Sequence, residues 1–84
     1  MDAKAVAFVE EAIRALARKD AGGARTAVSE AYDVDHSLGA VADAIYFACW
    51  QIEEDGRVTT AAWNTLADAV GPGPLSSVVE ESRS

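Results

Sequence analysis

Cysteine, histidine and proline are all scarce in this sequence, and the shortage of the first two limits the sites that it can build. Cys49 is the single cysteine, which excludes an internal disulfide and a site with several cysteine ligands. His36 is the only histidine, so a zinc site within one chain would have to rely on carboxylates. We therefore expect neither a metal nor a cofactor.

Basic residues are also few, and they are scattered. Seven lysines and arginines oppose fourteen aspartates and glutamates, which gives a net charge of -7. A chain with this charge repels both a polyphosphate backbone and an anionic membrane surface. Among the basic residues only Arg18 and Lys19 are adjacent, so the acidic total conceals no basic stripe. We expect no nucleic-acid partner and no membrane partner.

Long apolar segments are missing as well. The longest uninterrupted apolar run, residues 44–50, is far shorter than the roughly 20 residues that a membrane-spanning helix needs. Near the start, Asp2, Lys4 and Glu10 stand where a secretory signal would have a positive segment followed by an apolar one. We expect a cytoplasmic protein.

Alanine, by contrast, is abundant, and the apolar residues follow a helical period. Hydrophobic residues make up 50% of the chain and eighteen of them are alanine, so we expect a thin and closely packed core. The 3.6-residue period, bounded by capping residues and glycines, predicts four helices and a short fifth. They cover about 3–18, 21–32, 37–55 and 60–70, followed by a turn from Pro74 to Val79.

Local signals mark the ends of these helices. Asp20, Asp35 or Ser37, and Thr59 or Thr60 are the expected N-caps. No stretch alternates polar and apolar residues as a half-buried strand does. The sequence thus predicts an all-α protein, a small four-helix bundle of two antiparallel helical hairpins with a short fifth C-terminal helix. Residues 1–79 form a single helical domain in this prediction, and residues 80–84 form a flexible polar tail.

The third predicted helix is apolar around most of its circumference. At 100° per residue, Tyr46 and Trp50 fall on the flank of its core stripe, and Phe47 falls opposite the stripe. Two tryptophans and two further rings are too many for one thin core, so we expect some of them to face a groove or an interface. The candidate interface residues are Tyr46, Phe47, Trp50 and Trp63.

The first two predicted helices carry a family resemblance. The segment KDAGGARTAVSEAYDVD resembles the second half of a tetratricopeptide repeat, since Ala24, Val28 and Ala31 match the small, large, small pattern of that family's second helix. Phe8 and Ala12 fit its first helix, and His36 stands where the family usually has proline. The resemblance covers about residues 5–36. It implies a helical hairpin and a role in binding peptides or proteins.

The segment DVDHSLG permits a different reading. Ser37 and Leu38 resemble the Asp-Ser-Leu motif of acyl carrier proteins, which are small, acidic and four-helical, and that resemblance implies a phosphopantetheine on Ser37. His36 separates the serine from Asp35, however, and the usual glycine before the aspartate is missing. The simpler interpretation is that Ser37 or Asp35 caps the third helix.

The same loop does not make a calcium site. Asp33, Asp35 and Ser37 occupy the first, third and fifth positions of an EF-hand. Leu38 stands at the required glycine, however, and Ala44 at the bidentate glutamate. The caps described above account for the same residues.

No catalytic set is evident either. His36 and Ser37 are adjacent in sequence, and adjacent side chains rarely meet in the geometry of a hydrolase triad. Cys49 falls on a core stripe with no activating base nearby. A third possibility is an enzyme whose site forms only between subunits, using His36 with Asp33 or Asp35. The sequence indicates no reaction type for such a site.

We therefore predict a non-enzymatic protein-interaction module. It would act by self-association or partner binding through the third helix, with a protein partner or a second copy as its ligand. The alternative is an acyl-carrier-like domain modified on Ser37.

Overall fold

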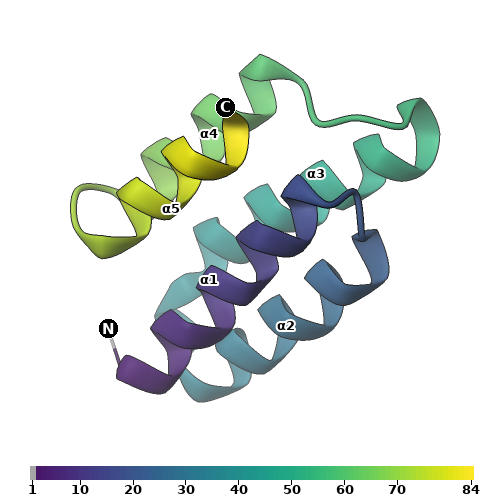
Figure 1. Ribbon diagram of the computed structural model, residues 1–84. Helices are drawn as coiled ribbons and strands as arrows, with labels where there is room; N and C mark the ends of the chain where they lie inside the picture. Colours follow the sequence, from purple (N-terminus) through teal and green to yellow (C-terminus); the bar gives the residue numbers. More distant parts are fainter. Residues whose placement is uncertain (1) are drawn as a thin grey trace.

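Five helices make up almost all of the chain in the computed structural model, which describes residues 2–84 (Figure 1). The all-helical class predicted from the sequence is confirmed, and no strand occurs in the described part. The elements are α1 (Ala3–Ala17), α2 (Ala21–Val34), the 3₁₀ turn η1 (His36–Leu38), α3 (Gly39–Asp55), α4 (Thr60–Val70) and α5 (Pro74–Arg83).

Short polar side chains begin α1, α2 and α4 by accepting hydrogen bonds from free backbone N–H groups of the first turn. Asp20 Oδ1 accepts from the Gly23 N–H at 2.9 Å, and Thr59 Oγ1 accepts from the Ala62 N–H at 3.2 Å. Both predicted caps are therefore confirmed, with Thr59 chosen over Thr60. Gly56 ends α3 with φ 77°, a left-handed conformation that costs glycine little because it has no Cβ.

The connection between α1 and α2 shows why glycine occurs inside the first turn of α2. The left-handed residue here is Lys19, with φ 62°, and Gly23 is already helical. A Cβ on Gly23 would overlap the carboxylate of Asp20. Gly23 therefore leaves room for the side chain that caps its own helix.

The helices form a closed ring of neighbours. Each of α2, α3 and α4 packs against the helix before it and the helix after it, and α5 packs against both α4 and α1. The most extensive contact joins α1 to α2, which lie side by side in Figure 1. Alanines are buried on both of these helices, and their small side chains let the two backbones approach closely. One hydrophobic cluster contains residues of all five helices.

α5 is longer than the sequence led us to expect. The helix continues to Arg83, so residues 80–83 are helical where we predicted a polar tail. Two causes are visible. Val78 and Val79 are buried, which holds the middle of α5 on the core. The Arg83 guanidinium then donates a hydrogen bond of 2.7 Å to Asn64 Oδ1 on α4 and pairs with Glu80 at 3.6 Å, which gives the last turn partners outside and inside the helix.

The length and hydropathy of each helix determine whether it could span a membrane. No helix within residues 2–84 is both long enough and apolar enough to cross a bilayer.

Candidate interaction surface on helix α3

One side of α3 is buried and the other carries large aromatic side chains in contact with solvent. Its buried residues are Val41, Ala42, Ala44, Ile45, Ala48, Cys49 and Gln51. Phe47 is 50% exposed, Trp50 is 51% exposed and Tyr46 is 38% exposed. We call these three residues the aromatic surface. Phe47 therefore lies outside the core, as its position around the helix predicts.

The rings of the aromatic surface are ordered relative to one another. Phe47 and Trp50 lie one turn apart on α3, and their ring centroids are 5.9 Å apart with an angle of 24° between the planes. This stacked geometry restricts the rotamers of both side chains before any partner arrives. A preordered surface loses less side-chain entropy on binding than a mobile one.

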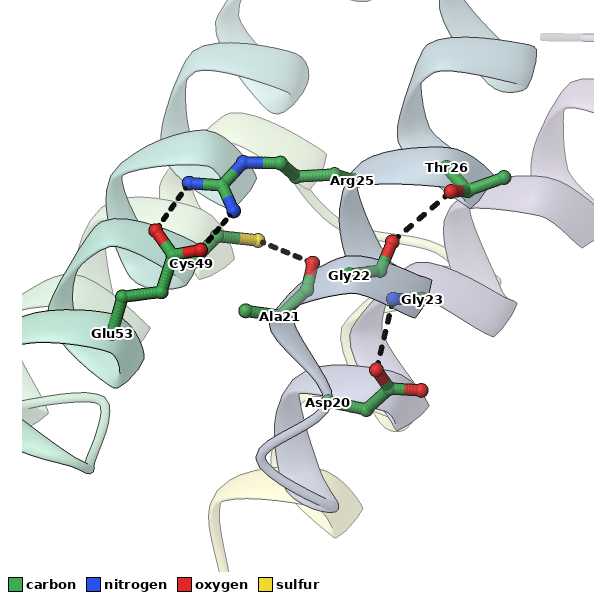
Figure 2. A network of polar contacts seen from close by, with 8 residues as sticks. All are labelled: Asp20, Ala21, Gly22, Gly23, Arg25, Thr26, Cys49 and Glu53. Atoms are coloured by element: carbon green, nitrogen blue, oxygen red, sulfur yellow. Dashed lines mark hydrogen bonds and ion pairs between the residues drawn. The ribbon is translucent and has the colours of Figure 1, made fainter.

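Two polar contacts join the edge of the aromatic surface to α2. The hydroxyl groups of Tyr46 and Ser29 are hydrogen-bonded at 2.6 Å. The second contact lies further along the same helix pair. Arg25, one turn before Ser29 on α2, donates two hydrogen bonds of 2.5 and 2.6 Å from its guanidinium to the carboxylate of Glu53, two turns after Tyr46 on α3 (Figure 2). This bidentate pair lowers the pKa of Glu53 and raises that of Arg25. Both contacts hold α3 in one rotation against α2.

Cys49 lies beneath this edge, and Figure 2 shows its sulfur directed at the first turn of α2. The side chain is fully buried, and its thiol donates a weak hydrogen bond of 3.5 Å to the Ala21 carbonyl oxygen. Burial raises the pKa of the Cys49 thiol. The neutral thiol is a poor nucleophile, so the geometry favours packing over chemistry at this residue.

A second polar cluster fixes α3 against the start of α4. Gln51 is buried, and its Oε1 accepts hydrogen bonds from the Thr59 N–H at 3.0 Å and from the Thr59 hydroxyl at 3.3 Å. Thr59 also caps α4, so one threonine joins the end of the α3–α4 loop to both helices. We did not anticipate this pair, because a buried glutamine is rare and no local spacing relates it to Thr59.

Acidic residues stand at both ends of the aromatic surface. Asp43 precedes Phe47 by one turn and Glu54 follows Trp50 by one turn, and both carboxylates are exposed. Neither makes an ion pair within residues 2–84, in contrast to Glu53. The exposed face of α3 is therefore apolar in the centre and negative at both ends.

Trp63, the fourth candidate interface residue, does not belong to this surface. It is only 8% exposed and packs in the hydrophobic cluster from its place on α4. Tyr32, near the end of α2, is a further exposed ring: it is 40% exposed, and its ring centroid lies 5.0 Å from that of the His36 imidazole.

The loop that contains Ser37 lies at the start of α3, before the aromatic surface. Asp35 Oδ1 accepts hydrogen bonds from the Ser37 N–H at 3.0 Å and from the Ser37 hydroxyl at 2.6 Å. These two bonds lower the pKa of Asp35. Asp35 thus caps η1. The helix α3 itself begins after Leu38 without a side-chain cap, so neither Asp35 nor Ser37 caps the third helix as predicted, because the short turn η1 contains Ser37 and separates Asp35 from α3. No group of three or more histidine, cysteine, aspartate or glutamate side chains is placed to hold a metal ion in residues 2–84.

We compared the chain with known protein families, curated proteins and solved structures. The chain matches no family model, no curated protein and no solved structure.

Proposed function

We propose that this protein is a non-enzymatic interaction module that binds another protein chain through the aromatic surface of α3. The single observation that carries the proposal is the exposure of Phe47 and Trp50, each about half accessible and stacked on the other. Aromatic residues are enriched at the centres of protein interfaces, where they dominate the binding energy.

The area of the aromatic surface agrees with this role. An aromatic side chain presents about 150–250 Å², so the exposed fractions of the three rings together amount to roughly 250–300 Å². A typical stable interface buries about 800 Å² on each partner. The three rings would then form the apolar centre of an interface, and the polar residues around them would form its rim.

In this proposal the remaining helices serve as a support. We treat α1 to α4 as a four-helix bundle of two antiparallel hairpins, with α5 bracing α1 and α4. The resemblance of residues 5–36 to a tetratricopeptide hairpin supports the same role, since that family binds peptides and proteins. Polar contacts on both sides of α3, Arg25 with Glu53 and Gln51 with Thr59, hold the aromatic surface in place.

Light scattering on a sizing column tests whether the partner is a second copy. We would compare the wild-type chain with the variants Phe47→Asp and Phe47→Lys. The two substitutions change the net charge in opposite directions, so loss of assembly in both identifies the ring as the cause. Lysine at position 47 also lies four residues after Asp43, which favours the helix. Circular dichroism should show unchanged helicity in both variants, since position 47 is exposed.

Val34→Asp is the matched control. Val34 is 40% exposed, lies on α2 outside the aromatic surface, and undergoes the same change from apolar to acidic. Assembly that survives in Val34→Asp and disappears in both Phe47 variants would confirm contact through α3. Assembly that persists in the Phe47 variants would refute the assignment to this surface. A monomeric wild-type chain restricts the proposal to binding a different protein, which the peptide titration in the next subsection tests.

The alternative proposal is a carrier domain modified on Ser37. One observation favours it, because Ser37 is exposed in the turn that opens α3. Its hydroxyl, however, is already hydrogen-bonded to Asp35. Incubation with a promiscuous phosphopantetheinyl transferase and coenzyme A should add one prosthetic group to the wild-type chain and none to Ser37→Ala. An unchanged mass of the wild-type chain would eliminate this alternative.

A further inference from the structure

We infer that the aromatic surface binds a basic amphipathic helix of another protein in preference to a second copy of this chain. The inference rests on the proposed function and specifies the chemistry of the partner. It is drawn from the charge pattern on the exposed face of α3.

The exposed face of α3 is a single row of side chains. Asp43, Phe47, Trp50 and Glu54 follow one another at intervals of four, three and four residues, which places all of them on one side of a helix. The two rings occupy the centre of the row and the two carboxylates occupy its ends. At a rise of 1.5 Å per residue, the backbone positions of the two acids are about 16 Å apart along the axis.

Nothing on α3 neutralises these two acids. The helix Gly39–Asp55 contains no lysine, arginine or histidine, and neither acid is in an ion pair within the part of the chain that the structure describes. Glu53, one residue before Glu54, is directed to α2 and is satisfied by Arg25. The row therefore presents two uncompensated negative charges to whatever covers the rings.

A second copy of the chain would meet this row with the wrong charges. In a two-fold antiparallel pairing centred between Phe47 and Trp50, Asp43 of one copy lies opposite Glu54 of the other, at both ends of the contact. In a parallel pairing, each acid lies opposite its own equivalent. Both arrangements oppose like charges beside an apolar centre, and each chain also has a net charge of -7.

A basic helix fits the same row in every respect. Apolar residues at i, i+3 or i+4, and i+7 would cover Phe47 and Trp50, as in other helix-in-groove complexes. Lysine or arginine residues one turn beyond each end of that apolar row would reach Asp43 and Glu54. The stems of these long side chains would also cover the edges of the rings.

The test uses two synthetic peptides and the complete chain. The basic probe is an amphipathic helix with leucines at i, i+3 and i+7 and a lysine one turn beyond each end. The acidic probe has glutamate in place of lysine. Isothermal titration measures both affinities, and the fluorescence of Trp50, the exposed tryptophan, reports contact with the surface. Two ion pairs replaced by two repulsions predict that the basic probe binds about 10- to 30-fold more tightly.

Variants separate the contributions of charge and ring. Asp43→Lys combined with Glu54→Lys should reverse the preference between the probes. The control pair Glu11→Lys and Glu30→Lys changes the net charge equally at exposed positions on α1 and α2, and should leave the preference in place. Phe47→Asp should abolish binding of the basic probe, although it adds a negative charge that would strengthen a purely electrostatic contact.

The other outcomes would refute either the preference for a basic partner or the role of the aromatic surface itself. Equal affinity for both probes, lost in Phe47→Asp, would refute the preference for a basic partner and leave α3 as the interaction surface. A wild-type dimer that both Phe47 variants dissociate would do the same. Binding of the basic probe that persists in Phe47→Asp, or a preference reversed by the control pair, would refute both the inference and the role of the aromatic surface. Binding of neither probe would overturn the inference, and light scattering would then decide the proposed function.

Discussion

The two tryptophans offer a direct comparison of a ring that is packed in the core with a ring that is exposed to solvent. Trp63 is 8% exposed and Trp50 is 51% exposed. Replacing a buried tryptophan by alanine removes its transfer free energy and leaves a cavity, at a cost of about 3–5 kcal/mol. For a chain of this length, such a loss lowers the midpoint of thermal unfolding by about 15–25 °C. Trp63→Ala should show a shift of this size.

Trp50→Ala should cost much less. Half of its side chain is in water in the folded protein, the change leaves no enclosed cavity, and alanine has the higher helix propensity. We expect a loss of about 1 kcal/mol, corresponding to about 5 °C. Differential scanning calorimetry of both variants measures the contrast at equal concentration.

Fluorescence examines the same contrast without relying on stability. In Trp63→Phe the remaining emitter is Trp50, which acrylamide should quench readily and whose emission should lie at long wavelength. In Trp50→Phe the remaining emitter is Trp63, which should be protected and blue-shifted. Equal destabilisation by the two alanine variants, or equal quenching of the two single-tryptophan chains, would refute the separation of core and surface on which the proposed function depends.

Three further predictions concern the contacts that hold α3. Thr59→Ala removes the α4 cap and takes away the hydroxyl that accepts a hydrogen bond from the buried Gln51 Nε2, so we expect a loss of about 2–4 kcal/mol in urea unfolding, although the backbone N–H of residue 59 still donates to Gln51 Oε1. Thr60→Ala, at the exposed neighbouring position, should cost little, and an equal loss would contradict the assigned cap. Because the pKa of Glu53 is lowered below 4.5 in the folded state, its contribution to stability is complete above that pH and is lost as the pH falls through the lowered value. Melting temperatures of the wild-type chain should therefore fall more steeply with acid than those of Glu53→Gln, and parallel curves would show that the pair with Arg25 does not form in solution. Cys49, which is fully buried with a raised thiol pKa, should react with Ellman's reagent only on unfolding; rapid reaction of the native chain would show that the α2–α3 contact is open.

Much of the local structure could be predicted from the sequence because it depends on residues close together in the chain. The cap at Asp20 needs only a carboxylate three residues before a free N–H group, and the stop at Gly56 needs only a residue that tolerates positive φ. The helical period of the apolar residues identified most of the core in the same way. It also placed Phe47 outside the core, since the position of a side chain around its own helix follows from residue number.

The exposure of Trp50 and Trp63 depended instead on how the helices pack. Both are large rings on amphipathic helices, and only the arrangement of α3 and α4 leaves one in water and encloses the other. The same holds for the end of α5. Glu80 and Arg83 read as a polar tail, yet Asn64 on α4 lies where the Arg83 guanidinium can reach it.

The packing of the helices also decided which acidic side chain forms an ion pair. Glu53 and Glu54 are chemically alike and adjacent, and sequence gives no reason to distinguish them. The rotation of α3 against α2 turns Glu53 toward Arg25 and leaves Glu54 beside Trp50. The sequence alone thus determined the number of helices, several of their ends and the inward side of most of them, because these follow from local hydrogen bonding and a fixed period. Only the tertiary structure decided which rings and which acids remain exposed and unpaired, because that depends on contacts between residues distant in the chain.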